Sequence, residues 1–226
     1  MTVEFLWRER PRPTRGPKPA MSLERIVAAA IAIADAEGLA AVSMQRVATD
    51  LGFTKMSLYR YLPGKAELVA LMVEQGLGEA PALDPADWRA ALAEWTSLLL
   101  DAMVRHPWAA EATAGPRPLG PNELGWMERA LAALPASGLA GIERLDTVAV
   151  LAGHARVTAG QVASRQREAD LGEAIGAVLR QHADRFPAVA AAFADAAVTG
   201  GQDQAFDFGL ARILDGLEAL IRGRAG

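Results

Sequence analysis

One stretch of the sequence, LGFTKMSLYRYLPGK, interleaves cationic and aromatic side chains within a few turns. It runs from Leu51 to Lys65 and contains both tyrosines of the chain, Tyr59 and Tyr61, together with Lys55, Arg60 and Lys65. Lysines can neutralise phosphates or reach guanine acceptors, and a tyrosine hydroxyl can donate to a backbone phosphate. Core preference alone does not explain Lys55, Tyr59 and Lys65 together. We interpret the stretch as a surface that contacts nucleic acid.

The spacing around this stretch is that of a helix–turn–helix unit. Ala48 is small enough for two helices to approach, Gly52 makes the turn four residues later, and Leu58 packs back into the angle. The second helix then presents Thr54 to Ser57 to a major groove, where hydroxyls, a lysine and a methionine can meet phosphates, guanine and the thymine methyl group. Tyr61 follows Leu58 by three residues, so it fits either the core or this surface.

Four helices are predicted in the first third of the chain from their caps and stops. They begin after Ser22, Ser43, Thr54 and Gly64. They end at Gly38, at Gly52, near Pro63 and in the region of Gly76 and Gly78. Residues 1–20 precede them as a basic, proline-rich arm, which is either a flexible leader or a segment that reaches along the DNA backbone.

The rest of the chain is predicted to be helical too, in longer pieces. Asp84 and Pro85 form an N-cap and N1 pair that starts a helix ending at His106. Its apolar stripe consists of Trp88, Leu92, Trp95, Leu99 and Met103. A later helix is expected to turn Leu124, Met127, Leu131 and Leu134 inward. Residues 139–168 are predicted to form one long helix whose middle, TVAVLAGHA, is apolar nearly all round and must be covered on more than one side. The last helix gathers Phe206, Leu210, Ile213, Leu214, Leu217, Leu220 and Ile221 on one face. No strand-period alternation occurs, so the fold class is all-α.

The segment SMQRVATDLGFTKMSLYRYLPGKAELV resembles the DNA-binding domain of the TetR family of bacterial repressors, and IVAAAIAIADAEGLAAVS resembles that family's first helix. The resemblance implies three parts: the arm at 1–20, a three-helix DNA-binding domain at 21–79, and a larger ligand-binding and dimerisation domain at 80–226. It also implies the residues that meet DNA. These are Ser43, Gln45, Thr54, Lys55, Met56, Ser57, Tyr59, Tyr61 and Lys65.

The segments HPWAAEATAGPRPLGPNELGWMERALAALPASGLAGIERL and FDFGLARILDGLEALI are similar to the ligand-binding domain of tetracycline repressors. Such proteins are all-helical homodimers whose long and final helices pair as a four-helix bundle, and an inducer separates their two DNA-reading heads. The resemblance implies a dimer interface containing Leu210, Ile213, Leu214 and Leu217. The candidate ligand-binding residues are Trp95, Met103, His106, Trp108, Trp126, Met127 and His154. Tryptophan and methionine at helical spacing are also typical of plain core.

In that subgroup a histidine matching His106 coordinates magnesium. Val162 stands about where the acidic partner of that site is expected, so we interpret His106 as a hydrogen-bonding or core histidine. His154 receives the same interpretation. We therefore expect no metal and no cofactor.

Composition excludes several other classes. The chain has 226 residues, a net charge of −4, three histidines and no cysteine, which rules out disulfides and thiolate chemistry. No apolar h-region marks a secretory signal, and no charge-free run is long enough to span a membrane, so we expect a cytoplasmic protein.

Two alternatives to a regulator are open. An enzyme lacks a nucleophile, paired carboxylates or a phosphate loop to work with. A helical adaptor that has lost DNA binding would show a degraded 43–65 segment, which this chain does not. The expected function is thus a repressor that binds a palindromic operator as a homodimer and is released by a small hydrophobic or aromatic ligand.

Overall fold

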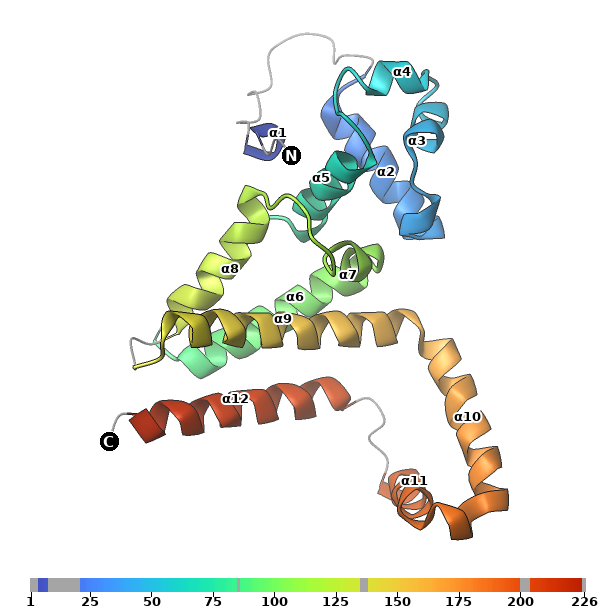
Figure 1. The fold of residues 1–226 in the computed structure, drawn as a ribbon, viewed down its shortest axis with the longest axis vertical. Coiled ribbons are helices and arrows are strands. Elements are labelled where there is room, and N and C mark those ends of the chain that lie inside the picture. Colours follow the sequence, from blue (N-terminus) through green and yellow to red (C-terminus); the bar gives the residue numbers. More distant parts are fainter. Residues whose placement is uncertain (1–3, 8–20, 85, 135–137, 200–203, 225–226) are drawn as a thin grey trace.

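The computed structural model describes residues 4–7, 21–84, 86–134, 138–199 and 204–224, and its elements are all helices (Figure 1). The α-helices are α1 (Glu4–Trp7), α2 (Leu23–Glu37), α3 (Met44–Asp50), α4 (Lys55–Leu58), α5 (Lys65–Leu77), α6 (Trp88–Arg105), α7 (Trp108–Ala112), α8 (Pro121–Ala133), α9 (Gly141–Ala163), α10 (Arg165–His182), α11 (Pro187–Thr199) and α12 (Ala205–Arg224). Two 3-10 turns cover Leu39–Ala41 and Ala183–Arg185. The all-α prediction is confirmed.

Helices α2 to α5 form a small head (Figure 1). Its caps are those predicted: the hydroxyl of Ser22 accepts from the Arg25 N–H at 3.3 Å, and that of Ser43 from the Arg46 N–H at 3.1 Å. Gly38 follows α2 with a φ of 85°, a conformation that residues with a Cβ rarely adopt. The short-range signals in the sequence therefore set the head's helix starts.

The third predicted helix is shorter than expected. Helix α4 covers only Lys55–Leu58, and the chain then turns, with the Tyr61 N–H donating to the Leu58 carbonyl at 2.9 Å. Thr54 occupies the N-cap position, but its hydroxyl does not bond to a main-chain N–H of the helix. It lies 3.0 Å from the hydroxyl of Ser57 instead.

The body consists of α6 to α9 with α12. Helix α6 packs along α9, and α12 runs beside α9 (Figure 1). The predicted stripe of α6 is confirmed as core, with Trp95 and Met103 each 2% exposed. Helix α9 presents the small residues Ala155 and Ala159, both fully packed, which lets the helix backbones come close.

Three details of the body differ from the prediction. Helix α6 starts at Trp88 and is capped by Asp87, not Asp84, because the Asp87 carboxylate accepts from two N–H groups of the first turn. The long helix ends at Ala163 and a new helix begins directly after Ser164. In α8 the fully buried side chains are Trp126, Ala130 and Ala133, with Leu134 just beyond, while Leu124, Met127 and Leu131 are half-buried.

Helices α10 and α11 project from the body (Figure 1). None of the described side chains of α11 is buried, although its sequence PAVAAAFADAAVT is almost wholly apolar. Phe193 is 43% exposed and Val198 is 86% exposed. This chain alone does not cover that apolar surface.

The start of the chain differs in part from a flexible arm. Leu6 of α1 is only 7% exposed, and the Trp7 indole donates to the Leu119 carbonyl at 3.2 Å, in the loop before α8. The basic residues from Arg8 to Lys18 lie outside the described residues. The proposed division between residues 79 and 80 falls in the connection between α5 and α6, and it stays a prediction. None of the described helices is both long and apolar enough to cross a membrane.

Candidate functional site

The helix–turn–helix angle closes over a fully buried pair, Ala48 and Leu58, each 0% exposed. The Phe53 N–H donates to the Ala48 carbonyl at 2.8 Å, which fixes the turn between α3 and α4. Gly52 supplies a φ of 75° there. A residue with a Cβ would be strained at that φ, so the glycine is a conformational requirement of the turn.

The nine residues implied to contact DNA lie within or next to helices α3, α4 and α5. Ser57 is half-buried and the others are exposed: Ser43, Gln45, Thr54, Lys55, Met56, Tyr59, Tyr61 and Lys65. Met56 is 72% exposed, which is unusual for an apolar side chain in a well-packed head. The core behind α4 thus fixes a short helix whose outer face is open.

Contacts within this face orient its longer side chains. The ammonium of Lys55 lies 5.6 Å from the ring centroid of Tyr59, a cation–π contact that holds the two together. Lys65 stands at the start of α5 and donates to the Leu39 carbonyl at 3.5 Å. Gly64, the N-cap of α5, has no side chain with which to cap the first N–H groups, so they can point at an anion.

Tyr61 is not part of the core. Its side chain is 43% exposed, and its hydroxyl donates to the Met21 carbonyl at 3.2 Å, just before α2. Of the two interpretations that the sequence left open, burial is therefore wrong. The hydroxyl instead connects the start of α2 to the turn after α4.

Arg46 is exposed on α3, but its guanidinium is already paired with a carboxylate. Both of its terminal nitrogens donate to Glu37, at 3.0 and 2.7 Å. The hydrogen bond from Arg46 lowers the pKa of Glu37, and the bond to Glu37 raises the pKa of Arg46. The arginine braces α2 against α3.

The candidate ligand-binding residues fall into separate groups. Trp95 donates to the Trp126 carbonyl at 2.9 Å, and their rings meet edge to face with centroids 6.1 Å apart. Trp126 in turn donates to the Gly78 carbonyl at 3.2 Å. Met103 is buried and Met127 half-buried. The indole N–H groups of Trp95 and Trp126 thus bind carbonyls of the chain itself. The assignment of these four residues to a ligand stays a prediction.

His106 and Trp108 meet a residue of the head. His106 Nδ1 lies 2.8 Å from Asp35 Oδ1, and the Trp108 indole donates to the same oxygen at 2.7 Å. Asp35 belongs to α2, so this carboxylate joins the head to the end of α6 and to α7. The sequence pattern did not indicate it, because Asp35 looks like any solvated residue near a helix end.

His154 belongs to a third group, between α9 and α12. Its Nε2 donates to the Phe206 carbonyl at 2.8 Å, and its ring stacks on that of Phe206 at a centroid distance of 5.2 Å. Gly209 leaves the space for the imidazole, since a Cβ there would lie 2.9 Å from His154 Nε2 and closer still to Cε1. Within the part of the chain that the structure describes, no group of three or more His, Asp or Glu side chains is arranged to hold a metal ion.

A second joint links head and body through Glu74 of α5, which is 6% exposed. Its two carboxylate oxygens accept from the Asn122 and Glu123 N–H groups, at 2.8 and 3.1 Å, in the first turn of α8. The Asn122 side chain returns a hydrogen bond to the Glu74 carbonyl at 2.8 Å. A carboxylate at a helix N-terminus is favourable because it meets unsatisfied N–H groups and the positive end of the dipole.

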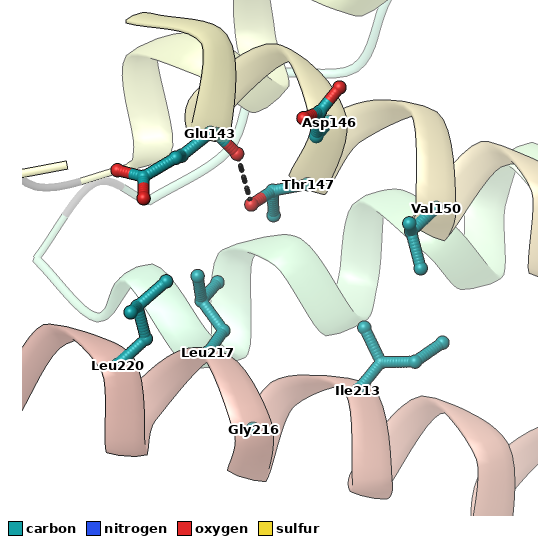
Figure 2. Close-up of a pocket in the computed structure, with 8 residues that line it drawn as sticks. All are labelled: Glu143, Asp146, Thr147, Val150, Ile213, Gly216, Leu217 and Leu220. Carbon is teal, nitrogen blue, oxygen red and sulfur yellow. Dashed lines mark hydrogen bonds between the residues drawn. The ribbon is translucent and has the colours of Figure 1, made fainter. Parts of the chain in front are cut away.

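The predicted interface residues on α12 lie mostly inside this chain. Leu210, Leu214 and Leu217 are 6%, 3% and 7% exposed, packed toward the chain's own core, and Ile213 is half-buried. A groove of about 290 Å³ runs between α9 and α12. Figure 2 shows Val150 and Ile213 pointing toward each other across it. Its lining residues are Glu143, Asp146, Thr147, Val150, Ile213, Gly216, Leu217 and Leu220.

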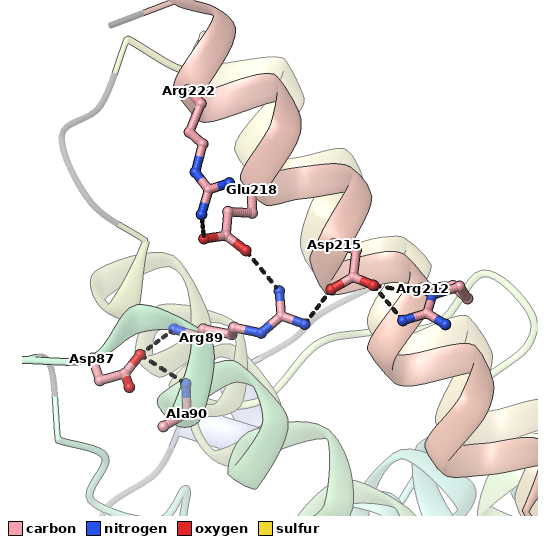
Figure 3. Close-up of polar contacts among 7 residues, drawn as sticks. All are labelled: Asp87, Arg89, Ala90, Arg212, Asp215, Glu218 and Arg222. Carbon is pink, nitrogen blue, oxygen red and sulfur yellow. Dashed lines mark hydrogen bonds and ion pairs between the residues drawn. The ribbon is translucent and has the colours of Figure 1, made fainter.

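Charged contacts fix α12 to the start of α6 (Figure 3). Arg89 donates to Asp215 and, at 3.3 Å, to Glu218. Arg212 and Arg222 flank these carboxylates from α12 itself. The hydrogen bond from Arg212, and then that from Arg89, lowers the pKa of Asp215. The register of α12 against the body therefore does not depend on apolar packing alone.

Comparison with known proteins identifies the family to which this architecture belongs. Residues 26–72 match the family model described as bacterial regulatory proteins, tetR family, and residues 80–221 match that of the tetracyclin repressor-like C-terminal domain. The HTH-type transcriptional repressor DrrR1 of Streptomyces coeruleorubidus is 39% identical over 241 residues, covering 100% of this chain and 87% of the relative. The Escherichia coli tetracycline repressor protein class C is 29% identical, covering 87% and 90%.

Among solved structures, the Streptomyces coelicolor TetR family protein ActR in complex with actinorhodin superposes with a TM-score of 0.77 at 28% identity. That match covers 89% of this chain and 98% of ActR. Its apo form gives a TM-score of 0.78, covering 93% and 100%. Matches to both halves, together with a relative aligned over the whole chain, establish the family. The chain belongs to the TetR family of bacterial regulatory proteins and is a ligand-responsive, DNA-binding transcriptional repressor.

Proposed function

We propose that two copies of this chain bind a palindromic operator, each placing α4 in the major groove of one half-site. Three residues are assigned to base edges and phosphates at the groove: Thr54 and Ser57 through their hydroxyls, and Lys55 through its ammonium. Met56 contacts a thymine methyl group. The observation that carries this proposal is the exposed face of α4, which is backed by a core containing the fully buried Ala48 and Leu58.

Phosphate contacts set the position of the head on the duplex. Tyr59 and Lys65 are assigned to one strand, and Ser43 and Gln45 at the start of α3 to the other side of the groove. Tyr61 belongs to the same exposed surface, with its hydroxyl oriented by Met21. These contacts carry no sequence information and make binding dependent on salt.

The dimer surface that we propose differs in part from the one that the resemblance to tetracycline repressors implies. Large apolar side chains of α9 and α12 remain exposed on this chain: Ile142, Leu145, Val150, Val157, Phe208 and Leu220. An extended apolar surface of this kind marks a protein interface. We assign these residues, with Ile213 and the groove of Figure 2, which Leu217 also lines, to the contact with the partner, and we assign Leu210 and Leu214 to the chain's own core.

The effector site is assigned to residues 80–226. Support comes from ActR, a relative of similar fold that was solved with actinorhodin bound. A small apolar or aromatic molecule is expected to favour a state in which the two heads no longer match the operator spacing. Asp35 and Glu74 are proposed to carry that change, because Asp35 binds the end of α6 and the start of α7 to the head, and Glu74 binds the start of α8 to it. Operator DNA must then weaken effector binding by the same factor.

Two further assignments rest on the family. Transcriptional repressors act by binding, so we assign no catalytic residue and no cofactor. A bacterial regulator of transcription works at the chromosome, so we assign this protein to the cytoplasm.

Mobility shift with an operator selected from the native genome tests the proposal. Lys65→Ala removes one phosphate contact per subunit, so the slope of log K against log salt should become shallower by about 0.9 per lost contact, or about twice that for a dimer. Tyr59→Phe isolates the hydroxyl and should weaken binding to all operator variants alike. Arg180→Ala, an exposed cation on α10, is the matched control. An unchanged slope in Lys65→Ala, or an equal change in the control, would refute the assignment.

A further inference from the structure

Two arginines that are far apart in the sequence meet at one residue of the body, Thr113. Thr113 ends α7 and is 7% exposed. Arg117 Nη1 donates to its carbonyl at 2.8 Å, and Arg156 Nε of α9 donates to its hydroxyl at 3.3 Å. Two guanidinium groups that bind the same residue lie close enough to repel each other unless an anion is near.

The available carboxylate is already used by one of them. The Glu123 carboxylate of α8 accepts hydrogen bonds from two nitrogens of Arg117, from Nε at 3.2 Å and from Nη2. The two side chains of this pair are 15% and 16% exposed. Arg156 has no such partner among the residues that the structure describes; its hydrogen bond is the one to Thr113. Its two terminal nitrogens therefore have no carboxylate to bind.

The surroundings make this imbalance significant. Burial, followed by repulsion from Arg117, lowers the pKa of Arg156, with Glu123 opposing. Burial also raises the pKa of Glu123, although Arg117 acts against it. The charge of Glu74 acts on Glu123, and its oxygens are bound by the first turn of α8. Within the described residues Glu123 attracts Arg156 without a hydrogen bond to it, because its oxygens are bound by Arg117, so the charge of Arg156 is only partly balanced.

We propose that Arg156 receives an oxyanion of the effector, such as a carboxylate, attached to an aromatic or apolar body. A guanidinium binds a carboxylate through two parallel N–H groups, and Nε is held by Thr113 so that the outer edge is presented. Arg117 adds a second positive charge behind it. The inference rests on the proposed effector site and specifies the chemistry that this site selects.

The same cluster gives the oxyanion a route to the head. Arg156 lies on α9, Thr113 is the C-cap of α7 and Glu123 lies on α8, so an anion at this point bears on three helices at once. An anion that draws Arg117 away from Glu123 loosens the first turn of α8. That turn is bound by Glu74 of α5, the helix that begins with Lys65 at the proposed DNA surface.

Fluorescence titration with a matched pair of dyes tests the inference. The anionic probe is 8-anilinonaphthalene-1-sulfonate, and the neutral probe is N-phenyl-1-naphthylamine, which has the same rings without the sulfonate. In the native chain the anionic probe should bind more tightly. Arg156→Met should weaken it by about tenfold or more, the size expected for a lost charge-assisted hydrogen bond, while leaving the neutral probe nearly unchanged. Arg156→Lys should restore part of the loss.

The control is Arg129→Met, which removes an exposed arginine from α8 of the same body. Its dye affinities should match those of the native chain. Circular dichroism and the unfolding midpoint show whether Arg156→Met folds, which is expected because it relieves the repulsion with Arg117. Equal loss of both dyes in Arg156→Met, or the same loss in Arg129→Met, overturns the inference.

Operator retardation, measured in parallel without dye, separates this inference from the proposed function. If the operator is retarded and the two dyes bind equally well, the anion site is wrong and the repressor assignment stands. If neither dye binds, both the anion site and the effector assignment are overturned. If the operator is not retarded but the dye preference depends on Arg156, the anion site is supported and the DNA assignment fails.

Discussion

Gly120→Ala is the sharpest test of the joint between α5 and α8. A Cβ at this position would lie 2.5 Å from Oε1 and 2.6 Å from Cγ of Glu74, distances that van der Waals contact does not allow. Because Glu74 is 6% exposed and held by two main-chain N–H groups, the new methyl group must push the carboxylate off the first turn of α8.

The magnitude follows from the contacts that are lost. Each hydrogen bond to a charged group contributes about 1.5–3 kcal/mol, and the displaced carboxylate recovers part of this from water, so we expect a net loss of about 3 kcal/mol. For a chain of this size such a loss lowers the thermal midpoint by about 6–12 °C. The assay is thermal unfolding followed by circular dichroism, with all variants at one protein concentration.

Gly115→Ala is the matched control in the same loop, because a Cβ there would meet nothing within 4 Å. Its midpoint should stay close to that of the native chain. In a Glu74→Ala background the methyl group introduced by Gly120→Ala would no longer clash, so the double variant should cost far less than the sum of the two single changes. Additive losses, or a Gly120→Ala midpoint equal to that of Gly115→Ala, would refute the reasoning.

Three other outcomes follow from the structure. Gly52→Ala should destabilise the head by about 1–2 kcal/mol, because φ there is 75°, and should weaken operator binding in a mobility shift; native affinity would argue against a rigid turn. Gly209→Ala should lower the thermal midpoint, since its Cβ would lie 2.9 Å from His154 Nε2, whereas Gly223→Ala on the same helix has nothing within 4 Å and should not; equal midpoints would contradict the packing. Acid should remove stability that Glu143 and Asp215 contribute, because Arg224 lowers the pKa of Glu143, and Arg212 and then Arg89 lower that of Asp215. The stability that these carboxylates contribute is present above their ordinary pKa values and is lost as the pH falls through the lowered ones. Glu143→Gln should therefore flatten the acid side of the curve of unfolding free energy against pH. An unaltered curve would count against this expectation.

Local signals in the sequence predicted the head well. Ser22 and Ser43 cap helices three residues ahead of the N–H groups that they accept, and Ala48, Gly52 and Leu58 fall within a single turn unit. Such contacts span few residues, so spacing alone determines them. The position of Tyr61 was not predictable in this way, because its hydroxyl binds the Met21 carbonyl, forty positions earlier in the chain.

Periodicity in the body predicted faces but not the surfaces that cover them. Leu210, Leu214 and Leu217 do form one stripe on α12, yet the stripe packs inward and leaves Phe208 and Leu220 outside. An apolar stripe carries no information on whether it meets its own chain or a partner.

The sequence did not predict the polar contacts between distant segments, because these contacts too depend on the folded arrangement. Asp35 meets Trp108, and Glu74 meets Asn122, across more than forty residues of sequence. Arg156 reaches Thr113 in the same way. In the sequence each of these charged residues looks like an ordinary solvent-exposed position, and only the folded structure shows its partner.

The bare apolar surface of α11 has a consequence for the life of the protein in the cell. Phe193 and Val198 are open to water in the single chain. If a second subunit covers this surface, the pool of dimeric repressor grows with the square of the pool of free subunits while those are scarce. Small changes in synthesis are then amplified into larger changes in operator occupancy.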